Sequence, residues 1–491
     1  MLKQMVQRTL KRLRNLRQTA VSPAEKCPLE HLKPSYSETR NITAPVSSNA
    51  LKEMNARMGA LQWVFQDYSF ETMPQWISFS TTYRCNLRCR HCQTHGTEEL
   101  ARKFNREVWP EELADSLAEQ LLPLAREYCL SLNGEPLLTP RLVTRLMNWR
   151  TYGARLHLTT NATLLTDRFI EAIVPHANQI HISVDAGTPY VYEAIRAGAR
   201  FPRLLHNLRL LTRTLESLGD YRKPALALSV TLMGSNIKEL PWLVDLAHFV
   251  NIPTVLCYPL TIYFPHVRGE EVSRHKILYN QYSEQARRKA RQLGVRLENL
   301  PPLFAQSDTE DAHKTAPTNM IAGILSDEYY SNVPPLASLV DDSEISRRAE
   351  NIAYRIKTKS SELPGSERDP VPGESQDVAE IISSWNSAAT NCGQIVKDLP
   401  PDDDTLCGYC ETLHKCSFIN HGGDVTPCCV TPHRPILGNI HRGTFRAIWN
   451  GPTHREFRKK VWSADPPDCC NGCRNLQRLT RGELATRLGI E

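Results

Sequence analysis

The sequence has no long apolar run. No stretch approaches the roughly 18 consecutive apolar residues that a membrane-spanning helix needs, so we expect no transmembrane segment. The N-terminus also lacks the continuous apolar segment and the small-residue cleavage site of a secretory signal peptide. Secreted disulfide proteins are normally much shorter than 491 residues. We therefore expect a cytoplasmic protein whose thiols stay reduced.

Beyond its basic N-terminus, the chain has no excess of charge of either sign. The net charge is +6, and residues 1–17 alone carry six basic side chains and no acid, which leaves 53 basic and 53 acidic residues in the rest of the chain. A neutral body argues against nucleic acid as a partner. Residues 1–18 predict a basic amphipathic helix, which docks on the protein's own surface or on a partner or acidic membrane surface.

Alternating strand and helix patterns are present between about residues 76 and 300. The expected strands are Ile77–Thr81, Cys129–Asn133, Arg155–Thr159, Ile180–Val184, Leu226–Leu232 and Thr254–Tyr258, with helices such as Pro110–Glu127 and Phe201–Leu218 between them. Such alternation predicts a parallel sheet with right-handed crossovers. Six units make an α/β fold of the partial (β/α)6, TIM-like barrel type, whose active site belongs at the C-terminal ends of the strands.

The remaining segments complete a four-part division of the chain, since 491 residues are too many for one compact core. Residues 1–75 form an N-terminal extension with a helix near 51–64. Residues 76–300 form the barrel. Residues 301–391 are rich in Ser, Asp, Glu and Pro and predict a polar linker or a substrate-covering insertion, with a helix near 343–357. Residues 392–491 form a small cysteine-rich module.

Eleven of the fifteen cysteines fall into two groups, and Cys27, Cys129, Cys257 and Cys392 stand alone. Three of the fifteen lie in Cys85-Asn-Leu-Arg-Cys89-Arg-His-Cys92, directly after the first expected strand, and eight lie between Cys407 and Cys473. Three thiolates on one loop can ligate three irons of a cubane cluster and leave the fourth iron open. A structural zinc site is the alternative, but it normally needs four ligands and C-x2-C pairs. The spacing therefore favours an iron–sulfur cluster at the mouth of the barrel.

This loop resembles the signature of the radical S-adenosylmethionine (radical SAM) superfamily, with His91 where the family usually has an aromatic side chain. The resemblance implies a [4Fe–4S] cluster on Cys85, Cys89 and Cys92, with S-adenosylmethionine at the open iron. One electron, from a donor such as flavodoxin or ferredoxin, would cleave S-adenosylmethionine. The resulting 5′-deoxyadenosyl radical would remove a hydrogen atom from a substrate C–H bond.

Further segments match the family in the same order. Asn133-Gly134-Glu135-Pro136 resembles the GGEP motif, which implies that Gly134 lets the backbone approach the methionine amino group and that Glu135 accepts its hydrogen bond. Asn161 resembles the TNG-type turn. The resemblance extends over roughly residues 76–300.

Three more positions are assigned by the same resemblance. Ser183 and Asp185 fall where the family places polar groups against the ribose or methionine. Arg196 resembles the basic residue that pairs with the methionine carboxylate.

The C-terminal module resembles the SPASM and twitch domains that follow many radical SAM cores. The implied ligands of an auxiliary [4Fe–4S] cluster are Cys410, Cys428, Cys470 and Cys473. A zinc ribbon would use the same four sulfurs. One auxiliary cluster is expected rather than two, because no cysteine follows Cys473.

The reaction depends on what becomes of the substrate radical. Cys392 stands alone in a polar turn, and the overall layout resembles radical SAM peptide epimerases, in which a thiol returns a hydrogen atom. Cys392 is either that catalytic donor or an incidental loop cysteine. We therefore expect a peptide maturase, most specifically an L-to-D epimerase acting on a ribosomally made precursor. A radical SAM dehydrogenase of a small sugar or aminocyclitol is the alternative. Clusters that only transfer electrons are disfavoured by the ordered S-adenosylmethionine motifs.

Overall fold

The computed structural model describes residues 48–64, 72–106, 111–130, 133–305, 327–361, 406–420, 422–428, 435–473 and 475–489. The helix predicted over residues 1–18 and the candidate donor Cys392 lie outside these described residues. Among them, no helix combines the length and the apolar character that a membrane span requires.

Six parallel strands form the expected partial barrel. They are β1 (Trp76–Phe79), β3 (Glu127–Cys129), β4 (Arg155–Thr160), β5 (Ala177–Ser183), β7 (Ala225–Leu232) and β8 (Thr254–Pro259). A short strand, β9 (Arg296–Glu298), continues the sheet beside β8. The prediction that the second strand runs to Asn133 is wrong, because the chain turns after Cys129 and residues 133–135 pack against the cysteine loop.

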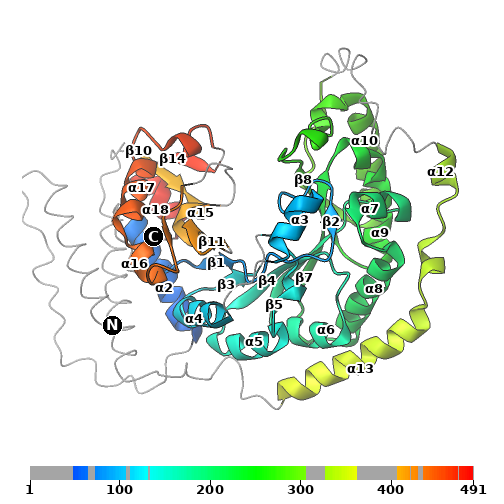
Figure 1. Cartoon of the computed structure of the whole chain (residues 1–491), viewed down its shortest axis with the longest axis horizontal. Coiled ribbons are helices and arrows are strands. Elements are labelled where there is room, and N and C mark those ends of the chain that lie inside the picture. The colour runs from blue at the N-terminus through cyan, green and yellow to red at the C-terminus, as the bar shows by residue number, and fades with distance from the viewer. Residues whose placement is uncertain are drawn as a thin grey trace, which may run out of the picture.

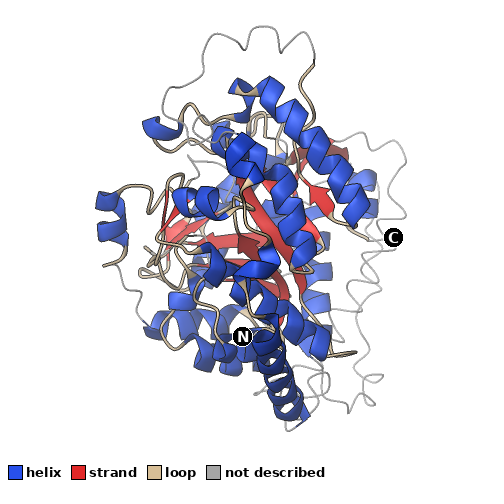
Figure 2. Cartoon of the chain, turned by 90° about the vertical axis from the view of Figure 1, so that its right-hand side faces the viewer, coloured by secondary structure: helices blue, strands red, loops and turns tan. Residues whose placement is uncertain are grey.

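Helices cover the outer face of the barrel (Figures 1 and 2). They are α4 (Glu111–Leu121), α5 (Leu142–Trp149), α6 (Asp167–Ile173), α7 (Pro189–Ile195), α8 (Phe201–Ser217), α9 (Leu240–Phe249) and α10 (Lys276–Leu293). The first of them ends at Leu121 and not at Glu127 as expected, because Glu127 already belongs to β3. Outward-facing strand residues such as Tyr128 pack against these helices, for example against Trp149 of α5.

The inner face of the sheet is more polar than the outer face. On β4 and β5 the burial alternates, so that Leu158 and Ile182 are buried while His157 and His181 are only half-buried. Because successive strand residues point to opposite faces, the half-buried set lines the inside of the barrel. The inside is therefore open to a polar ligand.

The C-terminal module continues the barrel sheet, which the sequence did not predict. β11 (Cys416–Ile419) pairs with β1 in parallel, and β12 (Asp424–Thr426) and β13 (Gly438–Asn439) follow in antiparallel. The described residues thus form one ten-stranded sheet in the order β13-β12-β11-β1-β3-β4-β5-β7-β8-β9. Strands far apart in the sequence pair because the edge of β1 would otherwise leave its backbone groups unsatisfied.

A second, two-stranded sheet completes the module. It consists of β10 (Leu406–Cys410) and β14 (Leu476–Thr480), and the surrounding helices are α15 (Glu411–Lys415), α16 (Phe445–Trp449), α17 (Pro452–Trp462) and α18 (Arg481–Arg487). The N-terminal helix α2 (Ser48–Val64), expected near residues 51–64, bridges the module and the barrel (Figure 1). Trp63 contacts Tyr409 and Trp462 at centroid distances of 5.8 and 4.7 Å, and Asn55 Nδ2 donates to the carbonyl of Leu124 at 3.1 Å.

Part of the expected linker is a packed element. α13 (Asp342–Ser361), predicted near residues 343–357, lies along α8 (Figure 1), with Ile345 and Ile352 buried. Arg209 of α8 donates to Asp342 at 2.9 and 2.6 Å. The preceding α12 (Asp327–Ser331) is anchored by Tyr330, which donates to the buried Glu239 at 2.9 Å.

Replacing Glu239 by glutamine is expected to reduce the pH dependence of stability. Burial raises the pKa of Glu239 from 4.5 to about 7, although Tyr330, Thr188 and Gly187 donate hydrogen bonds to it. Because the folded state holds this proton more tightly, stability is lost as the pH rises from 4.5 through 7, by roughly 3 kcal/mol at about 1.4 kcal/mol per pKa unit. Urea unfolding at about pH 5 and pH 8 measures the loss. An equal loss in wild type and Glu239→Gln would contradict the assignment.

Candidate active site

The three-cysteine loop follows β1 at the C-terminal edge of the barrel, where the sequence places the active site. Cys89 lies on a two-residue strand, β2 (Arg88–Cys89), that pairs in antiparallel with β6 (Arg196–Ala197). In this register Cys89 stands opposite Arg196. The main chain of Cys85 is held by Asn105, whose Oδ1 accepts its N–H at 2.9 Å. The loop is therefore fixed from two sides.

Arg196 lies directly beside the cysteine loop. Its side chain is almost fully buried, and Nη1 lies 3.7 Å from the sulfur of Cys89. Nε donates to the carbonyl of Val184 at 3.1 Å. A buried guanidinium at this distance favours a thiolate on Cys89 and any anion bound next to it.

Asp185 holds Arg196 in place. It is fully buried, and its Oδ2 lies 2.7 Å from Arg196 Nη2 and 3.7 Å from His91 Nε2. Its Oδ1 accepts the N–H of Thr231 at 2.8 Å. The backbone of Asp185 is left-handed, with φ of 69°, a conformation that non-glycine residues adopt rarely and at a cost. Asp185 was predicted to bind the cofactor, and in the structure its carboxylate forms an ion pair with Arg196.

The turn after β3 supports the cysteine loop. Gly134 has φ of +78°, and a Cβ there would lie 2.8 Å from Thr82 O, so only glycine fits. The N–H of Glu135 donates to the carbonyl of Arg84 at 2.8 Å, directly before Cys85. Gly134 therefore brings its backbone close to the cysteine loop.

Glu135 orders the neighbouring turn from a buried position. Its carboxylate accepts hydrogen bonds from Thr160 Oγ1 at 2.6 Å, from Asn161 N at 2.8 Å and from Leu137 N at 3.1 Å. Burial raises its pKa, although these donors favour the charged form. Three of its acceptor positions are thus taken by the protein.

Asn161 and Ser183 lie at the ends of the next two strands. Asn161 Nδ2 donates to Asn86 Oδ1 at 3.1 Å and lies 4.0 Å from the sulfur of Cys85. Ser183 is the last residue of β5 and is half-buried, two residues before Asp185. All seven predicted cofactor positions are therefore in the described structure, and five of them, His91, Glu135, Asn161, Asp185 and Arg196, interact with the cysteine loop or belong to it.

The three thiols differ in acidity. Burial raises the pKa of Cys85 and of Cys89 to about 12. Burial also acts against Cys92, but hydrogen bonds from His95 and Thr94 outweigh it and lower its pKa to about 7. Thr94 Oγ1 lies 3.3 Å from the Cys92 sulfur. Thr94 and His95 were not predicted from the sequence, and their position two and three residues after Cys92 was the available signal.

The residues fit an iron–sulfur cluster with a bound anionic group. Burial opposes the ionisation of the Cys85 and Cys89 thiols. Iron that displaces their protons would supply the positive charge that compensates the two thiolates. His91 Nδ1 is buried and has no hydrogen-bond partner among the described residues. A cationic Arg196 beside Cys89 suits a carboxylate. These residues suit a cluster held by three protein sulfurs, and the assignment of Cys85, Cys89 and Cys92 as its ligands stays a prediction.

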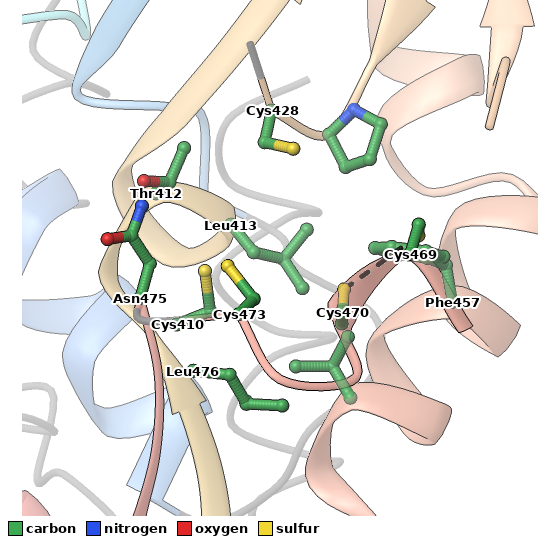
Figure 3. A pocket seen from close by; sticks show the side chains of 12 residues that line it. Cys410, Thr412, Leu413, Cys428, Phe457, Cys469, Cys470, Cys473, Asn475 and Leu476 are labelled. Carbon is green, nitrogen blue, oxygen red and sulfur yellow. Dashed lines mark hydrogen bonds between the residues drawn. The ribbon is translucent and has the colours of Figure 1, made fainter. Parts of the chain in front are cut away.

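A second sulfur-lined pocket lies in the C-terminal module (Figure 3). All four predicted auxiliary ligands line it: Cys410 from β10, Cys428 after β12, and Cys470 and Cys473 from the turn before β14. Cys469, not predicted as a ligand, also lines the pocket, and its sulfur lies 3.9 Å from that of Cys470. Burial raises the pKa of Cys410 and that of Cys470, and the neighbouring thiols raise both further. Tertiary structure brings the four together, and their assignment as ligands stays a prediction.

Comparison with known proteins agrees with both sites. Residues 79–228 match the radical SAM superfamily, and residues 407–474 match the SPASM iron–sulfur cluster-binding domain. The chain is 26% identical over 169 residues to the tungsten-containing aldehyde ferredoxin oxidoreductase cofactor-modifying protein of Pyrococcus furiosus, covering 34% of this chain and 46% of that protein. It is 24% identical over 201 residues to the AdoMet-dependent heme synthase of Methanosarcina barkeri, covering 40% and 53%. The chain thus spans about half the length of these relatives.

A similar solved structure is that of Streptococcus suis SuiB bound to the precursor peptide SuiA. The TM-score is 0.46 at 12% sequence identity, covering 82% of this chain and 70% of that one. At this level the similarity assigns no substrate to the chain.

Fold and sites together define a partial barrel with a three-cysteine loop at its mouth and a C-terminal module with a sulfur-lined pocket. The chain carries a radical SAM domain, matched over residues 79–228, and a C-terminal SPASM domain, matched over residues 407–474. The radical SAM domain implies a [4Fe–4S] cluster with S-adenosylmethionine. The SPASM domain implies auxiliary iron–sulfur clusters.

Proposed function

We propose that this enzyme abstracts a hydrogen atom from a C–H bond of a ribosomally made peptide, and that the outcome is L-to-D epimerisation at Cα. The observation that supports a peptide over a small sugar or aminocyclitol is an exposed apolar segment beside the cysteine loop.

The apolar segment is the mouth loop, residues 258–266, which begins with the last two residues of β8. Tyr258, Ile262 and Tyr263 are 41%, 38% and 45% exposed. The loop is attached to the cysteine loop, because His266 Nε2 donates to the carbonyl of Arg90 at 3.0 Å. Clustered exposed apolar side chains mark a binding surface. Peptide side chains bury apolar area there, whereas a polyhydroxylated sugar needs polar partners.

The chain's own residues bind and orient the reactants. When bound, the cluster and S-adenosylmethionine supply the 5′-deoxyadenosyl radical that removes the substrate hydrogen atom. Cys85, Cys89 and Cys92 would hold the cluster. Arg196, fixed by Asp185, would bind the methionine carboxylate. The burial of this network excludes water from the reacting groups.

Cys392 completes the proposed inversion. Its S–H bond breaks as a C–H bond forms on the opposite face of Cα. The cysteine thiyl radical then takes one electron from the low-potential reductant that the reaction consumes, and one proton from water. Because a thiol proton exchanges with solvent, the hydrogen that is returned carries the isotope of the water.

Epimerisation in D2O is expected to leave one deuterium on the product Cα. Reduced holoenzyme is incubated with S-adenosylmethionine and with any short precursor peptide that is encoded next to its gene. Mass spectrometry and chiral amino-acid analysis then detect the deuterium and the D-residue. Cys392→Ala should abolish inversion while 5′-deoxyadenosine still forms. Cys257→Ala, which removes a thiol buried in β8, serves as the control.

Other outcomes would remove parts of this proposal. A peptide product 2 Da lighter would indicate oxidation in place of epimerisation. Unchanged inversion in Cys392→Ala would exclude that thiol as the donor. Turnover of a sugar with no change to any peptide would contradict the substrate class.

A further inference from the structure

A pocket of about 550 Å³ lies at the edge of the sheet opposite the cysteine loop. It is lined by the N-terminal ends of β1, β3 and β11 on one side and by the β10–β14 sheet and α18 on the other. We call it the rear pocket, and its principal lining residues are Trp76, Glu127, Tyr409, Phe418, Gln477 and Arg487. Its volume falls within the range of small-molecule sites, roughly 300–1,000 Å³.

A row of rings connects the rear pocket with the inside of the barrel. The ring of Trp76 lies 5.4 Å from that of Phe418 and 6.5 Å from that of His157. His157 in turn lies 4.5 Å from His181 on β5, with Nε2 and Nδ1 3.3 Å apart. Burial lowers the pKa of His157 to about 4, so its ring is uncharged at neutral pH. The row offers aromatic contact without charge.

Two buried hydroxyls lie on the same face of the sheet. Ser78 and Ser80 alternate with outward-facing Phe79 and so share the inner face with Trp76. Both side chains are fully buried, and neither hydroxyl has a hydrogen-bond partner among the described residues. A buried hydroxyl without a partner costs about 1–3 kcal/mol. Neither serine lines the rear pocket, so these hydroxyls mark the polar inner face of β1 and not the ligand site.

The rear pocket leaves one cation uncompensated. Lys415 pairs with Glu411 at 2.7 Å, Arg126 pairs with Glu53, and Asn178 donates to Glu127 at 2.6 Å. Arg487 lies over the ring of Tyr409, with its guanidinium carbon 5.6 Å from the centroid. It has no carboxylate partner among the described residues. With these pairs counted, the lining as a whole is balanced in charge, because Glu127 meets the neutral Asn178, but a ligand carboxylate beside Arg487 would meet a cation that no described acid pairs with.

We propose that the rear pocket binds a segment of the peptide substrate in which an aromatic side chain stands next to a carboxylate. The aromatic ring packs on Trp76 and Phe418, and the carboxylate binds Arg487. This rests on the proposed function, since it assumes a peptide substrate. The four residues of β1 span about 10 Å at 3.3 Å each. The rear pocket and the cysteine loop thus lie at opposite ends of β1, so the segment that the pocket binds is separate from the residue that reacts.

Binding without turnover tests this assignment. Holoenzyme with S-adenosylmethionine but no reductant is titrated into two fluorescein-labelled nonapeptides, with Phe-Glu or Phe-Lys in a Gly-Ser-Ala background, and anisotropy is measured. The Phe-Glu peptide is expected to bind about tenfold more tightly, which corresponds to about 1.4 kcal/mol. Arg487→Ala should remove this preference. Trp76→Leu should weaken both peptides, and Trp76→Phe should restore their binding.

An exposed arginine outside the rear pocket supplies the matched control. Arg455→Ala on α17 should keep the preference for Phe-Glu. Equal binding of the two peptides to wild type, or an unchanged preference in Arg487→Ala, would overturn the inference. Either result leaves the D2O experiment untouched, so an error about the rear pocket is distinguishable from an error about the reaction.

Discussion

Replacing Cys89 by alanine is expected to reduce 5′-deoxyadenosine formation to the assay background and to remove about four irons per chain. Cys89 is the buried central thiol of the loop, paired in register with Arg196 and 3.7 Å from its guanidinium. Without its sulfur, one iron has no protein ligand and Arg196 loses the anion that it faces. Chromatography of the adenosyl product and iron analysis give the two readouts.

A different buried thiol provides the control for this loss. Cys257 lies in β8, fully buried, and pairs in register with the buried Val230, so it faces the outer helices. Cys257→Ala should keep both the iron content and the adenosyl product. Retention of S-adenosylmethionine cleavage by Cys89→Ala would mean that the loop does not ligate the reactive cluster.

Replacing Asp185 by asparagine is expected to destabilise the protein by roughly 3–5 kcal/mol, since it leaves a buried guanidinium without its counter-charge. Asparagine keeps the acceptor for Thr231 N and tolerates the left-handed backbone of this position. The substitution therefore removes little except the charge. Chemical unfolding measures the loss of stability.

Asp185→Asn should also shift the reduction potential of the reactive cluster. Released from Asp185, Arg196 no longer holds its position beside the Cys89 sulfur. We expect a shift in the reduction potential of the reactive cluster, measured by a redox titration followed by electron paramagnetic resonance. A purely structural role for Asp185 would leave this potential unchanged in the folded fraction.

The partly exposed pair on α13 gives a matched comparison. Asp342, 42% exposed in its side chain, pairs with Arg209 and Arg213 at 2.6 and 2.8 Å. Exposed pairs are worth about 0–1 kcal/mol, so Asp342→Asn should cost little and should not shift the potential. Equal losses in Asp185→Asn and Asp342→Asn would show that burial does not distinguish the two pairs.

Local spacing was enough to predict where the reactive centre lies. The C-x3-C-x2-C loop places three thiols within eight residues, and strand–helix alternation places that loop after the first strand. Gly134 shows the limit of such reasoning. Its positive φ and its close approach to Thr82 O bring together two segments that are distant in sequence. The motif predicted the glycine, but it could not predict which residue lies next to it.

The auxiliary site depended more on tertiary structure. Spacing selected Cys410, Cys428, Cys470 and Cys473, but Cys469 lines the same pocket, and adjacent cysteines differ only in the direction that the backbone gives their side chains. The pairing of β11 with β1 likewise could not be predicted from the sequence. Which strand pairs with an exposed strand edge depends on packing in three dimensions.

The sequence by itself determined the chemistry: a three-cysteine loop, its supporting turn and Arg196, all carried by short-range patterns of residue type. Only the tertiary structure decided that Asp185 forms an ion pair with Arg196 and that hydrogen bonds from His95 and Thr94 lower the pKa of Cys92. It also decided that the SPASM domain extends the barrel sheet. Hydrogen bonds and ion pairs depend on distances of a few ångströms between groups far apart along the chain. Such distances exist only once the burial of apolar side chains has set the packing.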